Sequence, residues 1–299
     1  MMETPARNLN SFHLAGIVPV AGSGADYGMD WDPCLMPVAP GFSAIEHAVQ
    51  ECAYLGCETI WVVCNDDIAP LLKHRLGDYV RDVESLERGS FIKFSSSAYT
   101  SIPIYYVPIH PTHRGKIDCY AWSVLHGANT AYWLTRRLSR WMIPDRYYVS
   151  FPLGIYDPSI VKKDRKSIRE KNAYYLSFKG QTVCDGLPLG FTFGTEEWKR
   201  ARDLIKKNSR TYAAPEAGQM PSELLPPSHR RVSRTYSLAD VFGEGPVHTA
   251  TIGEINWFYD LTKWSGYCNL LASPQCKELL APSDLAFPRT TLNNIGDTE

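Results

Sequence analysis

The sequence lacks the features that mark a zinc protein, a membrane-spanning protein or a secreted protein. Its eight cysteines include no Cys-x-x-Cys pair, the spacing that is typical of zinc sites. No apolar run reaches the roughly 18 residues of a transmembrane helix. The first residues, MMETPARNLN, also lack the apolar centre of a signal peptide. We therefore expect a protein of the reducing cytoplasm without a membrane partner.

The chain also lacks an excess of charge of either sign. It has 31 Lys and Arg against 32 Asp and Glu, which gives a formal net charge of −1. A protein without an overall basic field does not attract the phosphate backbone of DNA or RNA. Nucleic acid is therefore not an expected partner, and nothing in the sequence indicates an oligomeric state.

The apolar content is high enough for a large core. Hydrophobic residues make up 44% of the 299 residues, which suffices for one large domain. We expect this single domain to span residues 12–299 and to include a substrate-side lobe at 160–250. The polar residues 1–11 would precede it as a loose segment.

The amino-terminal part of the chain has the pattern of a strand, a loop, a helix and a second strand. The apolar runs LAGIVPV and TIWVVC predict buried strands at 14–20 and 59–64. Apolar residues at helical spacing predict a helix at 42–55, with Ser43 as its N-cap and Gly56 as its stop. This is a βαβ pattern, which joins parallel strands.

The same alternation continues along the chain. Further strands are expected at 102–109, 146–151, 173–178 and 189–193, and further helices at 69–76, 121–141, 195–207 and 261–272. We therefore predict an α/β fold with a mainly parallel central sheet, helices on both faces and a small mixed lobe. In such a sheet, ligands bind at the carboxyl ends of the strands.

The first strand runs into a loop of small residues, VAGSG, which begins at Val20 and Ala21. Because Gly22, Ser23 and Gly24 have no bulky side chain, their backbone N–H groups can approach a phosphate closely. A nucleotide is therefore the first ligand to consider.

Six segments spread over most of the chain occur in a characteristic order: GIVPVAGSG, LMPVAPGFSAIEHAVQECAYLGCETIWVVC, CYAWSVLHGANTA, YLSFKG, LGFTFGTEEW and WFYDLTKWSGY. In this order they resemble the nucleotidyltransferases that make nucleotide sugars, a family whose fold is shared with GT-A glycosyltransferases. The resemblance implies transfer of a nucleotidyl group from an NTP to a sugar phosphate or a related phosphate, with Mg²⁺ or Mn²⁺ as cofactor. Each segment alone is a weak signal, and the resemblance depends on their shared order.

The resemblance also implies roles for individual residues. The loop from Val20 to Gly24 would hold nucleotide phosphates, and Ala121 and Trp122 would lie near the base. Lys179 would contact the phosphate of the acceptor, although a lone lysine is commonly a solvated surface charge. Asp260 would bind the metal, although an aspartate at this place could instead cap the following helix.

The chain departs from the family pattern in the basic residues that the family carries beside its glycine-rich loop. The family has an Arg or Lys shortly after the glycines and a Lys just before Leu-x-Pro. Here residues 25–32 contain three aspartates and no basic residue, and Pro33 and Cys34 occupy the lysine region. A replacement could come from the cluster HPTHRGK, which contains His110, His113, Arg114 and Lys116.

A second departure concerns the metal ligands. The family has a Gly-Asp pair whose aspartate binds Mg²⁺, whereas this chain reads FPLGIYDP, with Leu153 about where that aspartate belongs. Asp157 lies four residues further on and is our candidate for the second carboxylate. Asp66 and the aspartates of the loop at 25–32 are the alternatives, because hard oxygen ligands suit Mg²⁺.

Three functions remain open on the sequence. The first is a nucleotidyltransferase that uses an NTP and a phosphorylated small-molecule acceptor. The second is a glycosyltransferase that uses a nucleotide sugar, which need not attack an α-phosphate and therefore tolerates the missing basic residues. The third is a catalytically inactive nucleotide-binding or scaffold protein that has kept the fold.

Overall fold

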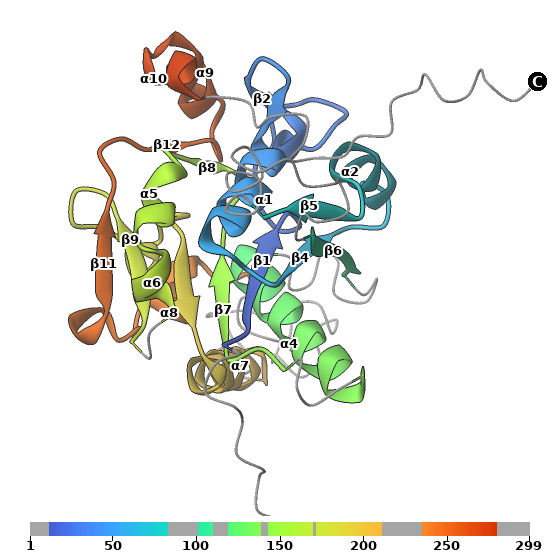
Figure 1. Cartoon of the computed structure of the whole chain (residues 1–299), viewed down its shortest axis with the longest axis vertical. Coiled ribbons are helices and arrows are strands. Elements are labelled where there is room, and N and C mark those ends of the chain that lie inside the picture. The colour runs from blue at the N-terminus through green and yellow to red at the C-terminus, as the bar shows by residue number, and fades with distance from the viewer. Residues whose placement is uncertain are drawn as a thin grey trace, which may run out of the picture.

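The computed structural model of the chain describes residues 12–82, 101–109, 119–138, 143–169, 172–210 and 235–279. Eight strands build one central sheet (Figure 1): β1 (Leu14–Pro19), β4 (Thr59–Cys64), β5 (Tyr79–Arg81), β6 (Ser101–Pro108), β7 (Arg146–Val149), β9 (Tyr174–Ser177), β10 (Phe191–Phe193) and β11 (Thr251–Glu254). Their order across the sheet is β11-β9-β10-β7-β1-β4-β6-β5. The first predicted strand therefore lies inside the sheet, between β7 and β4.

The sheet is mainly parallel, as the βαβ pattern predicted. Strand β1 pairs in parallel with β4 and β7, β4 pairs in parallel with β6, and β9 pairs in parallel with β11. Strand β10 is antiparallel to both β7 and β9, and β5 is antiparallel to β6 at one edge. Every residue of β1 and β4 is buried, which explains why these strands are continuous apolar runs.

Helices cover both faces of the sheet (Figure 1). They are α1 (Ala44–Leu55), α2 (Ala69–Leu76), α4 (Tyr120–Leu138), α5 (Ser159–Lys163), α6 (Arg165–Ile168), α7 (Thr195–Arg210), α8 (Leu238–Phe242), α9 (Trp264–Ala272) and α10 (Gln275–Glu278). Because successive strand residues point to opposite faces, Leu14 and Val18 of β1 share a core with α1, α2, α5 and α6. Ala15 and Ile17 share the other core with α4, α7 and α8.

Helix α1 begins and ends at the residues that the sequence predicts as its N-cap and its stop, Ser43 and Gly56. The Glu46 carboxylate accepts hydrogen bonds from the backbone N–H and the hydroxyl of Ser43, both at 2.8 Å, which is a capping box. At the other end, Gly56 has a φ of +70° and its N–H donates to Ala53 O at 3.0 Å. The predicted N-cap and stop are therefore confirmed.

Several predicted boundaries differ from the structure by one to three residues, and two of these differences have a clear local cause. The strand predicted to end at Phe151 ends at Val149, because the chain turns at Phe151 and the Gly154 N–H donates back to Phe151 O at 3.1 Å. The helix predicted from residue 261 begins at Trp264, because the Asp260 carboxylate accepts the Thr262 N–H and forms a turn first.

Two small sheets complete the described fold. Strand β8 (Gly154–Ile155) pairs in antiparallel fashion with β12 (Tyr259–Asp260), and β2 (Pro37–Ala39) pairs with β3 (Phe42–Ser43). Within the described ranges, no helix has both the length and the apolar character needed to cross a bilayer. The division into one domain at 12–299 with a lobe at 160–250 stays a prediction, and residues 1–11 lie outside the described part of the chain.

Candidate functional site

The loops that carry the candidate residues leave the central sheet at one edge. Strands β1, β4, β6 and β7 are parallel, and β9 and β11 share their direction because β10 is antiparallel to both β7 and β9. The glycine-rich loop follows β1, Leu153 follows β7, and Lys179 follows β9. Asp260 follows β11 and pairs with the segment after β7. The topology therefore gathers these residues at the carboxyl edge, where α/β sheets bind ligands.

The start of the glycine-rich loop is fixed to the sheet. The backbone N–H groups of Val20 and Ala21 both donate to Val63 O of β4, at 2.9 and 3.0 Å. Ala21 O accepts a hydrogen bond from the Ser123 hydroxyl of α4 at 2.7 Å. Both residues are buried, and their N–H groups are already used. Val20 and Ala21 therefore hold the loop in place, and any phosphate contact falls to the residues that follow.

The residues that follow have a backbone suited to an anion. Gly22 and Gly24 have φ values of +77° and +65°, a conformation that favours glycine. Within the described residues, the backbone N–H groups of Gly22, Ser23 and Gly24 have no hydrogen-bond partner. The left-handed Gly22 and Gly24 alternate with Ser23, whose φ is not positive. Such alternation turns successive N–H groups toward one point and builds a concave anion-binding nest. A Cβ on Gly24 would meet nothing within 4 Å, so this side of the loop is open.

The acidic residues after the glycines stabilise the loop itself. The Asp26 carboxylate accepts the Gly28 N–H at 2.7 Å, and the Asp32 carboxylate accepts the Cys34 N–H at 2.9 Å. Burial raises the pKa of Asp32 above its ordinary value. These contacts are ordinary turn and cap interactions, so the structure explains two of the three loop aspartates without a ligand.

An aromatic residue of this loop, which the sequence did not single out, connects the loop to the segment around Asp260. The Tyr27 hydroxyl donates to Leu261 O, and the Tyr27 ring lies 5.3 Å from the Trp264 ring in an edge arrangement. The Tyr27 ring also stacks on Tyr267 at 6.3 Å. The loop after β1 is thus joined to the segment that carries Asp260.

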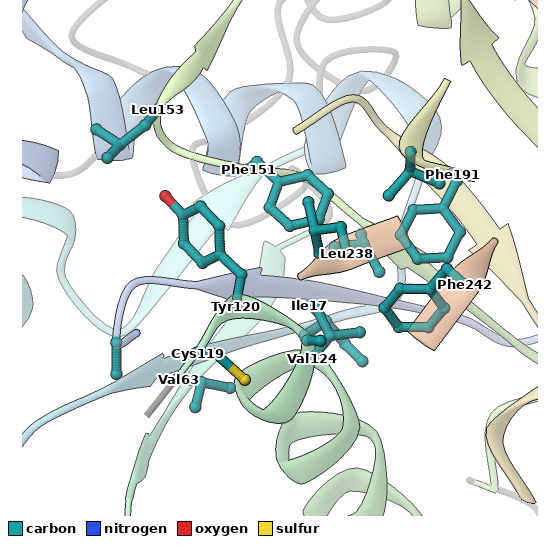
Figure 2. Packing of buried hydrophobic residues seen from close by; sticks show 14 of the residues in the cluster. Ile17, Val63, Cys119, Tyr120, Val124, Phe151, Leu153, Phe191, Leu238 and Phe242 are labelled. Carbon is teal, nitrogen blue, oxygen red and sulfur yellow. The ribbon is translucent and has the colours of Figure 1, made fainter. Parts of the chain in front are cut away.

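Asp260 lies beside the segment in which the resemblance would place a Gly-Asp pair and this chain has Leu153. Asp260 pairs with Gly154 across β12 and β8, and the Leu261 N–H donates to Leu153 O at 2.7 Å. Leu153 therefore stands next to Asp260, and its buried side chain lies near Tyr120 and Phe151 (Figure 2). The place that would bring a second carboxylate toward Asp260 holds an apolar residue.

Asp157 is engaged elsewhere. Its two carboxylate oxygens accept the Ser159 N–H at 2.9 Å and the Ser159 hydroxyl at 2.7 Å at the start of α5. In the part of the chain that the structure describes, no group of three or more His, Cys, Asp or Glu side chains could hold a metal ion. The described residues do not fit a metal site made by the protein alone. The Asp260 carboxylate itself accepts the Thr262 N–H at 2.9 Å, the same kind of turn contact that Asp26 and Asp32 make.

Lys179 occupies an unusual backbone conformation at the end of β9. Its φ is +53°, which makes it the one non-glycine residue with a positive φ among the described residues. Phe178 and Gln181 exchange two backbone hydrogen bonds of 2.9 and 3.0 Å around it, so Lys179 and Gly180 form a tight turn. The side chain is exposed, and its Nζ lies 5.1 Å from the centre of the Phe178 ring. A lysine held in this conformation at a ligand edge is a candidate for function.

We predict that Lys179→Gly increases the stability of the protein by about 1 kcal/mol, because glycine adopts a positive φ without the steric cost of a Cβ. The matched variant Lys179→Met removes the charge and keeps the cost, so its stability is expected to stay close to that of the wild type. Urea unfolding measures both. Equal stabilities of the glycine and methionine variants would contradict the assigned backbone strain.

The segment expected near the base is buried at its start. The Ala121 side chain is fully buried in the core, and Tyr120 packs its ring at 5.3 Å on Phe151 (Figure 2). Trp122 is half-buried. The basic cluster at 110–116, the proposed replacement for the missing basic residues, lies outside the described residues.

Comparison with known proteins supports the fold. No family model and no curated protein matches the sequence. The chain is similar in structure to a protein assigned as a glucose-1-phosphate thymidylyltransferase from Bacillus anthracis, solved in complex with sucrose. The TM-score is 0.54 at 12% identity, over 91% of this chain and 98% of that one. It is also similar to a UDP-glucose pyrophosphorylase complexed with UDP-glucose, with a TM-score of 0.52 at 11% identity, over 89% and 100% of the two chains.

Identities this low show the fold alone. The chain has the α/β fold of nucleotide-diphospho-sugar transferases, as the order of its segments predicted.

Proposed function

We propose that this protein is a nucleotidyltransferase-like enzyme that transfers a nucleotidyl group from an NTP to a sugar phosphate or a related phosphate. The observation that carries the proposal is the open nest of N–H groups at Gly22, Ser23 and Gly24. It lies at the sheet edge where Lys179 and Asp260 also emerge. Both structural relatives bear the names of enzymes of this kind.

In the proposed reaction, an oxygen of the acceptor phosphate attacks the α-phosphorus of the NTP. A new P–O bond forms, the bond from the α-phosphorus to the bridging oxygen breaks, and pyrophosphate leaves with the electron pair. The nest would hold the phosphates through N–H donors, and Lys179 would hold the acceptor phosphate. Asp260 would contact Mg²⁺ or Mn²⁺ bound to the NTP, a cation that neutralises phosphate charge. Ala121 and Trp122 would lie beside the base.

A second candidate, a nucleotide-binding protein without turnover, is favoured by Leu153 in the place of a carboxylate beside Asp260. The absence of basic residues from 25–32 favours the same candidate, and it also suits a glycosyltransferase that uses a nucleotide sugar. Both alternatives use the same edge of the sheet. The glycosyltransferase would break the bond between the sugar and the nucleotide, whereas the binding protein would break none.

One assay separates the three functions. The protein is incubated with Mg²⁺, each common NTP and a panel of sugar phosphates, and pyrophosphate is measured. We expect release by the wild type and a loss of about 100-fold in Asp260→Asn, as for other electrostatic groups of active sites. Turnover of a nucleotide sugar without pyrophosphate would identify the glycosyltransferase. Stabilisation by a nucleotide without either reaction would identify the binding protein. The absence of all three effects would overturn the proposal.

A further inference from the structure

A buried carboxylate contacts the segment that follows β7 and has no role in the proposed reaction. Glu51 of α1 is fully buried. Its carboxylate accepts hydrogen bonds from the Tyr148 hydroxyl of β7, from the Ser150 hydroxyl at 2.7 Å and from the Tyr156 hydroxyl just after β8. Three hydroxyl donors from one stretch of the chain therefore converge on a single side chain of α1.

A second side chain of α1 holds the same stretch. His47 lies one helical turn before Glu51 and is also fully buried. Its Nε2 is 2.8 Å from Tyr156 O, a carbonyl that only accepts, so Nε2 carries the proton. Burial lowers the pKa of His47 to about 4, and the ring is neutral near neutral pH. Glu51 and His47 together therefore hydrogen-bond to both ends of the segment from Ser150 to Tyr156.

The segment from Ser150 to Tyr156 also contacts the chain at Asp260. Between its two ends lie Leu153, whose carbonyl accepts the Leu261 N–H at 2.7 Å, and Gly154, which pairs with Asp260. A movement of the segment would therefore move Asp260. Helix α1 is thus connected to Asp260 in two steps: its side chains hydrogen-bond to the segment from Ser150 to Tyr156, and this segment pairs with the chain at Asp260 and Leu261.

The surroundings of Glu51 leave little room for a compensating group. A Cβ at Gly190 would overlap the Tyr148 hydroxyl and would lie 2.8 Å from Glu51 Oε1, so the chain before β10 closes over the carboxylate. The titratable groups that face it are Tyr148, Tyr156, Tyr174 with its partner Asp164, and on α1 His47 and Cys52. Near neutral pH none of these groups is cationic.

Burial raises the pKa of Glu51 to about 7, against the opposing effect of the three hydroxyl donors. The acid and the carboxylate are therefore both populated at neutral pH. A negative charge in this closed space has no counter-charge among the groups that face it. Water entering this space would stabilise that charge. The segment from Ser150 to Tyr156 contacts both Glu51 and Asp260, so a movement that admits water here would also reach Asp260.

We propose that Glu51 is a positioning residue of the candidate site. As a neutral acid it donates its own O–H to one of the three facing hydroxyl oxygens and keeps the segment from Ser150 to Tyr156, and with it Asp260, in place; as a carboxylate, a buried charge without a counter-charge, it loosens both. The structural part of this proposal stands without the proposed function, and the effect on nucleotide binding rests on it.

Hydrogen exchange of the full-length protein tests the structural part. Exchange is compared for wild type and Glu51→Gln at about pH 6 and about pH 8, on either side of the Glu51 transition. Taking the ratio to the variant at each pH removes the intrinsic pH dependence of exchange. Between the lower and the higher pH, we expect the protection of the amides of 150–156 and 259–261 against exchange to fall several-fold in the wild type relative to the variant. Equal pH dependence in both proteins would overturn the proposal.

Two further variants sharpen this test. Asp164→Asn alters another carboxyl–tyrosine pair, the half-buried Asp164 with the Tyr174 hydroxyl at 2.7 Å, and is expected to behave as the wild type. Tyr156→Phe removes one donor that stabilises the carboxylate, so the transition is expected to move to higher pH. This variant decides the matter if Glu51→Gln does not fold: an unmoved transition would overturn the proposal.

Nucleotide binding then separates this proposal from the proposed function. Each common NTP is titrated with Mg²⁺ into wild type and Glu51→Gln at the same two pH values. We expect a several-fold weaker affinity of the wild type at the higher pH and an unchanged affinity of the variant. pH-dependent protection without any nucleotide binding would support the positioning role and count against the proposed function. Nucleotide binding with the same pH dependence in both proteins would count against the positioning role alone.

Discussion

Replacing Gly22 by alanine is expected to destabilise the protein by about 3 kcal/mol, the sum of left-handed backbone strain and an overpacked contact. Gly22 has a φ of +77°, and a Cβ there would lie 2.5 Å from the carbonyl carbon of Cys119 and 2.6 Å from its amide nitrogen. These are backbone atoms at the start of α4, so no side-chain rotation relieves the overlap. Urea unfolding measures the loss.

Gly24 provides the matched control for this prediction. It has a similar φ of +65°, but a Cβ there would meet nothing within 4 Å. Gly24→Ala is therefore expected to cost about 1 kcal/mol, from the backbone conformation alone. Equal losses in the two variants would contradict the close packing of the loop on α4. A larger loss in Gly24→Ala would contradict the openness of the loop toward the ligand edge.

The stability of the wild type is expected to fall by about 3 kcal/mol, relative to Glu51→Gln, as the pH rises from about 4.5 to about 7. Burial raises the pKa of Glu51 in the folded protein from its ordinary value of 4.5 to about 7. Between these values the folded state keeps a proton that the unfolded state has lost. The stabilisation is complete below the lower value, shrinks as the pH rises through the window, and is gone above the higher value.

The comparison with the variant isolates this effect. Other carboxylates titrate in the same pH range, but they are present in both proteins and their contributions cancel in the difference. Chemical denaturation of both proteins at several pH values measures it. A difference between wild type and Glu51→Gln that does not change with pH would show that Glu51 ionises normally in the folded protein.

The fold could be predicted from the sequence because its signals are local. The apolar runs at 14–20 and 59–64 are uninterrupted since both strands are buried on both faces. Ser43 and Gly56 mark the ends of α1 through contacts within four residues of each end. The gathering of the glycine-rich loop, Lys179 and Asp260 at one edge then follows from the parallel order of the strands.

The contacts inside the site could not be predicted in this way because they join residues far apart in the chain. Glu51 reads as one more polar residue of a helix until Tyr148 and Tyr156, about a hundred positions later, are known to face it. Tyr27 gives no sign of its bond to Leu261. Asp157 stays a predicted metal ligand, and the two hydrogen bonds that its carboxylate accepts from Ser159 are contacts that the sequence did not indicate.

The central claim is that the loop at Gly22–Gly24, Lys179 and Asp260 form one site for the phosphates of a nucleotide and its acceptor. Its most direct test is equilibrium titration of the wild type, Lys179→Met and Asp260→Asn with each common NTP and Mg²⁺, and then with a panel of sugar phosphates. We predict that at least one NTP binds the wild type and that Asp260→Asn weakens this binding about tenfold, the equivalent of one charge-assisted contact. Lys179→Met is expected to leave NTP binding unchanged and to weaken the binding of a sugar phosphate by a similar factor. No NTP binding to the wild type, or equal binding of both ligands to all three proteins, would contradict the claim.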